Sequence, residues 1–271
     1  MQKVMALVSG LVLAPAILMS APATAALDWD KALNGEHRSE KNKARDEFRH
    51  PRETLEFFGL KEDMTVVELS PGGGWYTEVL APLLHDAGSY YAAHNSPNGG
   101  AYSRRSLGGY LQKLGKDNDT YGNVTVTTLG PADSVVIAPA GTADMVLAFR
   151  NVHSWMRADT LANTLLVAYD ALKPGGVFGV VQHRAKDGRD PERMKATGYV
   201  SEDYIIAAAR SVGFELDGRS EVNANPKDRG DYEDGVWELP PSLNTAEENR
   251  EAHRAIGESD RMTLKFVKSA S

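Results

Sequence analysis

Cysteine is missing from all 271 residues of the sequence. Its absence excludes disulfide bonds, thiolate metal sites, cysteine nucleophiles and the acylated cysteine that anchors a lipoprotein. An excess of positive charge is missing too, because the formal net charge is −7, so the composition indicates no nucleic-acid partner. With 42% hydrophobic and 25% charged residues the composition is that of a globular protein, and we expect one soluble, acidic domain.

Long apolar runs are absent except at the N-terminus, where one extends from Val4 to about Met19. Lys3 precedes this run, and the small-residue sequence Ala23-Thr24-Ala25 follows it. A positive start, an apolar core and a small-residue exit are typical of a cleaved secretory signal, and the run falls short of the ~20 residues of a membrane-spanning helix. We therefore expect a signal peptide over residues 1–26, export to the bacterial periplasm and no stable membrane anchor.

The segment that follows, residues 27–50, is polar and crowded with charged side chains. We expect it to be a solvated, partly helical N-terminal arm that leads into a domain over residues 51–271. A short helix with Pro51 near its start and Gly59 near its end is expected to open that domain.

Within the domain, short apolar runs alternate with helix-like segments. A helix is expected over Ala158–Leu172, and another, capped by Ser201, runs to Ser211. This alternation favours a doubly wound α/β domain with a mostly parallel, seven-stranded sheet and helices on both faces. The expected strands are Met64–Leu69, Tyr90–Ala93, Val124–Leu129, Asp144–Phe149, Gly176–Gln182, Phe214–Leu216 and Met262–Val267.

Two segments do not fit the alternation. Residues 96–116 are glycine-rich and are expected to be a loop-rich insertion, and residues 223–249 are rich in Pro, Asp, Asn and Glu and contain Trp237. Long irregular segments of this kind are either lids and substrate loops or surface elaborations without a role. Both interpretations stay open at this point.

The most informative motif is the glycine run that follows the first expected strand. The strand ends at Leu69, and Gly72, Gly73 and Gly74 follow before a helix begins. Three glycines let the backbone approach a ligand, and the amides at the start of the helix can bind a polar or anionic group. The run does not fit the dinucleotide pattern G-x-G-x-x-G, because Thr77 stands where the third glycine would be.

This motif resembles motif I of the class I S-adenosylmethionine-dependent methyltransferases, an acidic residue followed by G-x-G-x-G. Glu68 stands at the acidic position, and Ser70, Gly72 and Gly74 stand at the three glycine positions, with Ser70 as a departure from the pattern. The resemblance implies a Rossmann-like methyltransferase fold and S-adenosyl-L-methionine as cofactor. It also implies that Glu68 orients the methionine end or the loop and that the glycines line the cofactor.

Later segments match the same family in order. Ala143–Phe149 resembles its fourth strand, Leu172–Phe178 the turn into the fifth, and Asp260–Val267 the seventh, antiparallel strand. Within the family, the chain looks most like a group of exported bacterial predicted methyltransferases of undefined substrate. The resemblance thus implies methyl transfer to a small-molecule acceptor that the sequence does not identify.

At two positions where the family contacts the cofactor, this sequence has a different residue from the family's usual one. The family usually has an acidic residue for the ribose at the end of the second strand, where this sequence has Asn95. An Asp often contacts adenine after the third strand, and Asp133 is the candidate substitute. Phe149 and Arg150, at the end of the fourth expected strand, complete the expected cofactor-binding set.

Candidate catalytic and substrate residues follow the fourth and fifth expected strands. His153 and His183 stand at carboxyl ends of strands, where ligand crevices of open α/β sheets lie. Either histidine could serve as a general base if the acceptor arrives protonated. Trp155 and Arg184 are the expected acceptor-binding residues, and Arg150 could bind an anionic or aromatic acceptor as well. The same residues could instead cap helices and fill loops.

Two other functions remain open on the sequence alone. An exported, non-catalytic ligand-binding protein could have kept this fold, an interpretation motivated by Asn95 at the ribose position. A metal-assisted enzyme could use His94, His153 and His183, although their spacing matches no metal-ligand motif, so we assign no metal ligand. The sequence gives no oligomeric state.

Overall fold

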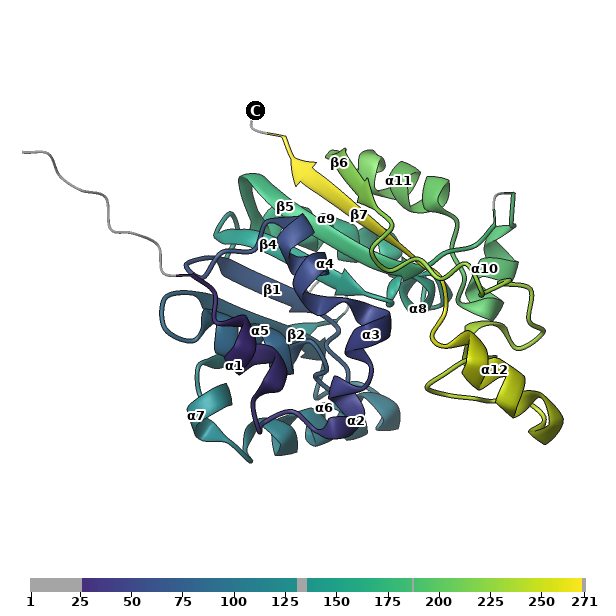
Figure 1. Ribbon diagram of the computed structural model, residues 1–271. Coiled ribbons are helices and arrows are strands. Elements are labelled where there is room, and N and C mark those ends of the chain that lie inside the picture. Colours follow the sequence, from purple (N-terminus) through teal and green to yellow (C-terminus); the bar gives the residue numbers. More distant parts are fainter. Residues whose placement is uncertain (1–25, 131–135, 187, 270–271) are drawn as a thin grey trace, which may run out of the picture.

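A computed structural model describes residues 26–130, 136–186 and 188–269. Seven strands form one sheet in the spatial order β3-β2-β1-β4-β5-β7-β6, and Figure 1 shows the part of this order from β2 to β6. Their bounds are β1 Thr65–Leu69, β2 Ser89–Asn95, β3 Val124–Leu129, β4 Ala143–Phe149, β5 Leu172–His183, β6 Phe214–Ser220 and β7 Arg261–Lys268. The expected doubly wound, seven-stranded sheet is confirmed.

The direction of the strands defines where a ligand can bind. β1 to β5 pair in parallel, whereas β7 lies antiparallel between β5 and β6. The strand order reverses at β1, which has β2 on one side and β4 on the other. In open α/β sheets the crevice outside the carboxyl ends of the strands at such a switch point is the ligand site.

Helices cover both faces of the sheet because the strand side chains alternate between two cores. Val66 packs in one core with α1, α4 and α5, and its neighbour Val67 packs in the other with α8, α9 and α11. The helices are α1 Trp29–Asn34, α2 Glu40–Lys43, α3 Asp46–Arg49, α4 Pro51–Phe58, α5 Thr77–Leu84, α6 Ala101–Leu114, α7 Asn118–Tyr121, α8 Val152–Arg157, α9 Leu161–Ala171, α10 Pro191–Thr197, α11 Glu202–Ser211 and α12 Arg250–Ile256.

One of the two segments outside the alternation differs from the expectation. Residues 96–116 were expected to be loop-rich, but they contain the 14-residue helix α6, which connects β2 to β3. Gly108 and Gly109 lie inside this helix, and glycine has a low helix propensity. Residues 223–249 are mostly irregular and include the short 3-10 helices η2 Gly235–Glu238 and η3 Glu247–Asn249.

The N-terminal arm is partly helical as expected, but it is not simply solvated. Arg38 and Arg49 are each only 2% exposed. Arg38 Nη1 lies 2.7 Å from Asp46 Oδ2, and Trp75 Nε1, beside the glycine run, donates to the carbonyl of Asn42 at 3.1 Å. Several charges of the arm, among them Arg38, Arg45 and Arg49, are paired within the fold, so this run of charged residues is not a solvated face throughout. α2 and α3 therefore lie over the carboxyl-end edge of the sheet (Figure 1).

The expected signal peptide lies almost entirely outside the described residues. Among the residues that the structure does describe, no helix is long and apolar enough to cross a membrane.

Candidate functional site

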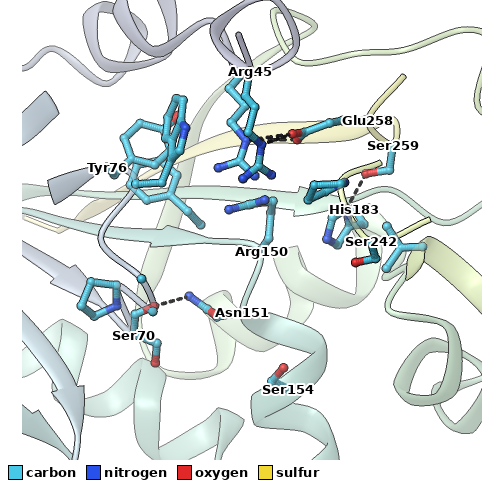
Figure 2. Close-up of a pocket in the computed structure, with 18 of the residues that line it drawn as sticks. Arg45, Ser70, Tyr76, Arg150, Asn151, Ser154, His183, Ser242, Glu258 and Ser259 are labelled. Carbon is cyan, nitrogen blue, oxygen red and sulfur yellow. Dashed lines mark hydrogen bonds and ion pairs between the residues drawn. The ribbon is translucent and has the colours of Figure 1, made fainter. Parts of the chain in front are cut away.

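A cavity of about 450 Å³ opens at the carboxyl ends of β1, β4 and β5. The glycine loop, the start of α8, the N-terminal arm and the irregular segment near Trp237 surround it, and Figure 2 shows its polar side chains. The residues that line it are Asn42, Arg45, Arg49, Glu68, Ser70, Pro71, Gly72, Gly73, Trp75, Tyr76, Phe149, Arg150, Asn151, His153, Ser154, His183, Val236, Trp237, Pro240, Pro241, Ser242, Glu258 and Ser259.

The glycine loop presents open backbone to this cavity. Gly72 has a φ of 59° and Gly74 a φ of 75°, a left-handed conformation that glycine adopts without steric cost. Within the described chain, a Cβ atom added at Gly72 or Gly73 would meet nothing within 4 Å. Ser70, with a φ of 52°, is held by Asn151 Nδ2, which donates to its carbonyl at 3.1 Å. The loop is therefore fixed from outside and accessible from the cavity.

Glu68 is buried at the base of this loop. Its carboxylate accepts a short hydrogen bond from the Tyr90 hydroxyl and one from Thr77 Oγ1 at 3.4 Å. Burial raises the pKa of Glu68 to about 7, although both hydrogen bonds oppose the shift. Glu68 thus connects β1, β2 and the start of α5 while one side of it lines the cavity.

His94 and Asn95, at the end of β2, lie beside the glycine loop. His94 Nδ1 accepts a hydrogen bond from the Asn95 backbone N–H at 2.7 Å, which leaves Nε2–H to donate to the Gly72 carbonyl at 3.0 Å. The His94 ring therefore supports the glycine loop. Asn95 is partly buried at the end of β2, and Asp133 lies outside the described residues.

Phe149 and Tyr76 form an aromatic wall of the cavity. Their rings are stacked, with 3.5 Å between centroids and 7° between planes. Phe149 is the last residue of β4 and Tyr76 immediately precedes α5, so the stack joins the end of β4 to the start of α5 next to the switch point.

Arg150 follows this wall and projects towards the centre of the cavity (Figure 2). Its backbone φ is 64°, and its backbone N–H donates to the Val181 carbonyl at 2.7 Å. Burial lowers the pKa of Arg150 to about 10, with a further contribution from the positive charge of Arg261, while Glu258 opposes the shift. Its left-handed backbone conformation is uncommon for a residue other than glycine and directs the side chain into the cavity.

The two candidate catalytic histidines both line the cavity, with 5.8 Å between their ring centroids. Gln182 Oε1 accepts from the Val152 N–H, so its amide nitrogen donates to His153 Nδ1 at 3.2 Å. The proton of neutral His153 then resides on Nε2, which makes that nitrogen a donor rather than a base. Burial lowers the pKa of His153 to about 4.

His183 has a different partner. Its Nδ1 lies 2.5 Å from Ser259 Oγ, a contact that Figure 2 shows. Burial, the neighbouring His153 and the arginines around it hold the pKa of His183 well below its ordinary value. At neutral pH the imidazole is uncharged and therefore able to accept a proton.

The structure does not bring the two expected acceptor-binding residues into the cavity. Trp155 is buried beneath the glycine loop and its Nε1 donates to Ser70 Oγ at 3.4 Å. Arg184 Nε lies 2.9 Å from Asp260 Oδ2, and its Nη2 lies 2.6 Å from Glu221 Oε2. Neither side chain lines the cavity: Trp155 supports the glycine loop, and Arg184 is paired with two carboxylates.

The structure adds functional candidates that the sequence did not indicate. Arg45 and Arg49 come from the charged arm, and Glu258 and Ser259 from the turn before β7. The i,i+4 spacing of the two arginines was visible, but nothing in one sequence relates them to Glu258, 209 residues away from Arg49.

The metal hypothesis finds no support in the geometry. In the parts of the chain that the structure describes, no group of three or more His, Cys, Asp or Glu residues could hold a metal ion. His94 instead donates to a backbone carbonyl of the glycine loop.

Comparison with known proteins supports the fold. No family model matches the sequence, and no curated protein matches it. A SAM-dependent methyltransferase from Aquifex aeolicus superimposes with a TM-score of 0.56 at 18% identity, covering 83% of this chain and 92% of that one. The [4+2]-cyclase SpnF superimposes with a TM-score of 0.59 at 15% identity, covering 87% of this chain and 85% of that one.

The chain has the class I methyltransferase fold. At these identities the likeness concerns the fold alone, and the SpnF match shows that a cyclase also has this fold. The reaction therefore has to be argued from the site.

The residues of the site fit the cofactor that this fold suggests. The open positions at Gly72 and Gly73 would be filled by a side chain of any other residue, and no backbone or side-chain acceptor among the described residues takes their amide protons. These amides and the cavity beside them suit the methionine half of S-adenosylmethionine. Asn95, the expected ribose residue, is not among the residues that line the cavity.

Proposed function

We propose that the protein is an S-adenosylmethionine-dependent methyltransferase that acts on a small-molecule acceptor. The observation that carries this proposal is the open glycine loop at the switch point, which forms one wall of a 450 Å³ cavity that extends to His183. The cofactor supplies an electrophilic methyl group, and positioning provides much of the catalysis of an in-line displacement.

Each part of the site has a role in this proposal. Gly72 and Gly73 bind the cofactor through their amides, Glu68 keeps the loop in place through Thr77, and Asn95 binds the ribose. The stacked rings of Tyr76 and Phe149 exclude water from one side of the cavity.

His183 is the proposed proton acceptor for an acceptor molecule that arrives protonated. Its Nδ1 contact with Ser259 fixes the orientation of the ring, and its lowered pKa keeps it uncharged at neutral pH. His153, with its proton on Nε2, donates a hydrogen bond instead and so orients the acceptor.

Calorimetric titration with S-adenosylhomocysteine tests the proposal. We expect wild-type protein to bind it and Gly73→Val to lose at least about tenfold in affinity, or about 1.4 kcal/mol, because the new side chain occupies the open space beside the loop. Gly109→Ala is the matched control, since it lies in α6 and its added Cβ also meets no described atom within 4 Å. If the wild-type protein does not bind at millimolar ligand, the proposal is wrong.

A second candidate function, a non-catalytic binding protein, is favoured by Asn95 at the ribose position. Transfer of label from methyl-labelled S-adenosylmethionine to a panel of small acceptors separates the two candidates. Binding without transfer to any acceptor supports the non-catalytic protein, whereas transfer to one acceptor excludes it.

We also propose that the protein is exported after signal cleavage. The proposal is supported by the order of Lys3, the apolar run from Val4 and the small residues Ala23–Ala25. Expression of the full chain in a bacterium, followed by fractionation and mass spectrometry of the N-terminus, tests it. A periplasmic product that begins near Ala26 is expected, and a cytoplasmic product with an intact leader would contradict it.

A further inference from the structure

Four arginines lie in or directly behind one wall of the cavity and form what we call the arginine cluster: Arg45, Arg49, Arg150 and Arg261. They come from the N-terminal arm, from the end of β4 and from the start of β7. The first three line the cavity, and Figure 2 shows Arg45 and Arg150 converging on it from opposite sides.

The carboxylate of Glu258 forms ion pairs with three members of this cluster. Glu258 lies 2.6 Å from Arg45 Nε, 3.0 Å from Arg49 Nε and 3.2 Å from Arg261 Nη1. Arg150 has no hydrogen bond or ion pair from its guanidinium to any residue that the structure describes. The other acidic residue of the cavity wall, Glu68, accepts hydrogen bonds from Tyr90 and Thr77 instead. The cluster therefore holds more positive than negative charge.

Arg49 shows this imbalance at the level of single atoms. Its side chain is 2% exposed and its guanidinium stacks over the Trp75 ring at 4.6 Å. Its Nη1 and Nη2 have no acceptor among the described residues. A buried, unsatisfied charged donor is strongly unfavourable unless a ligand provides the acceptor.

The physical environment of the cluster favours an anionic partner. Burial first, and then the positive charge of Arg150, lower the pKa of Arg49 to about 9. Burial also lowers the pKa of Arg261 to about 10, with Glu258 opposing the shift. A bound anion would oppose both shifts, because its negative charge favours the protonated guanidinium groups.

We propose that the arginine cluster binds a carboxylate or phosphate group of the methyl acceptor, so that the acceptor is a small organic anion. The identification of the ligand as the methyl acceptor rests on the proposed function, whereas the anion site is inferred from the arginine cluster alone. The guanidinium fork of arginine matches both anions with two parallel hydrogen bonds.

The place and the charge of the cluster favour the acceptor over the cofactor as the source of the anion. Glu258, which organises the cluster, is followed in the chain by Ser259, the partner of His183, so the anion would lie beside the proposed proton acceptor. S-adenosylmethionine carries an ammonium and a sulfonium besides its single carboxylate, and several guanidinium groups would repel these two cations.

Anion binding to the purified protein is the first arm of the test. Inorganic phosphate, succinate and benzoate are titrated at constant ionic strength, with sodium chloride as the reference. We expect at least one of them to raise the melting temperature of the wild-type protein by about 3 °C at ten times its dissociation constant. No rise above that of sodium chloride with any of the three would overturn the proposal.

Arginine variants form the second arm. Arg150→Met is expected to weaken binding of the effective anion at least about tenfold, and Arg45→Met to do the same. Arg219→Met is the control, because Arg219 lies on β6, is 54% exposed and pairs with Glu202. Unchanged anion affinity in both cluster variants would overturn the proposal.

The third arm distinguishes the two sources of the anion. S-adenosylhomocysteine carries the amino-acid carboxylate and 5′-methylthioadenosine lacks it. If Arg150→Met weakens S-adenosylhomocysteine but not 5′-methylthioadenosine, the cluster holds the cofactor and the proposal is wrong. Equal affinity of wild type and variant for S-adenosylhomocysteine supports the acceptor. If neither nucleoside binds the wild type, the proposed function fails, while the first two arms still decide on the anion site.

Discussion

Arg49 Nε lies 3.0 Å from Glu258 Oε2 and joins α3 to the turn before β7 across 209 residues of sequence. The ion pair is almost completely buried, with 2% and 5% of the two side chains exposed. It fixes the N-terminal arm over the cavity and at the same time directs the rest of the Arg49 guanidinium to the cavity wall.

Glu258→Gln is expected to destabilise the protein and to flatten its acid response. Burial raises the pKa of Glu258, but Arg49, Arg261, Arg150 and Arg45 outweigh burial and hold the pKa at about 2, below the ordinary value of 4.5. A depressed pKa contributes stability that is present above about pH 4.5 and is lost as the pH falls towards about 2. The difference corresponds to about 3 kcal/mol.

Denaturant unfolding from about pH 7 to about pH 3 measures this effect. The free energy of unfolding of the wild type is expected to decrease as the pH falls through this range. That of Glu258→Gln is expected to be lower at neutral pH and to change less with pH. Glu221→Gln is the control, because Glu221 is 67% exposed and its pair with Arg184 contributes at most about 1 kcal/mol. Parallel pH curves for wild type and Glu258→Gln would show that the carboxylate is not the acid-sensitive group.

Glu68→Gln is expected to have the opposite pH dependence. Burial raises the pKa of Glu68 to about 7, so its contribution to stability is complete below the ordinary pKa of 4.5 and is lost as the pH rises through about 7. The glutamine side chain is neutral at every pH. The free energy of unfolding of the Glu68→Gln variant should therefore lack the decline of about 3 kcal/mol that the wild type shows over this range. Unfolding at about pH 5 and about pH 8 measures it. An equal decline in both proteins would contradict this assignment.

The backbone of the site could be predicted from the sequence because its signals are local. The β-branched run Val124–Leu129 predicts β3 with its bounds. Ser201 stands at the N-cap position of α11 as expected, but its side chain makes no capping hydrogen bond. The glycine loop was found because it follows a buried strand. Such features depend on residues within a few positions of each other.

The polar wall of the cavity could not be predicted because its contacts are distant in sequence. Arg49 was assigned to a solvated arm, since one sequence does not tell a surface charge from one that is paired with Glu258. Trp155 and Arg184 were assigned to the acceptor because they lie near strand ends, but their side chains turn to Ser70 and to Asp260. A strand end places a residue at the site's edge and does not determine where its side chain points.

Asn95→Asp is expected to tighten binding of adenosine-containing ligands. The carboxylate of the family's usual residue accepts from both ribose hydroxyls, whereas Asn95 has a single acceptor oxygen. Charge-assisted hydrogen bonds are roughly twice as strong as neutral ones, so we expect a gain of about threefold to tenfold, or about 1 kcal/mol, in affinity for S-adenosylhomocysteine. Calorimetry measures it, and Asn95→Ala is expected to weaken binding. Unchanged affinity in both variants would show that the ribose does not contact β2.

His153 is expected to be a neutral donor with a fixed tautomer. Because the Gln182 amide donates to Nδ1, nitrogen-15 NMR of labelled histidine should place the proton on Nε2 at neutral pH. Burial keeps its pKa at about 4, so the ring should not titrate above about pH 5. Gln182→Leu removes the amide donor and should allow both tautomers. A proton on Nδ1 in the wild type would contradict the donor role.

His183→Gln is expected to reduce methyl transfer by about 10²-fold or more, which is the usual contribution of a general base. Because burial and the surrounding positive charge lower the pKa of His183, the wild-type rate should stay level between about pH 8 and about pH 6, where an ordinary histidine would begin to lose activity through protonation. Ser259→Ala removes the partner of Nδ1 and should lower the rate with little change in cofactor affinity. The matched control is His85→Gln, since His85 lies at the far end of α5 and contacts Asp86. If the wild-type rate decreases as the pH is lowered below about 7, and His183→Gln shows the same decrease, the proton transfer belongs to another group.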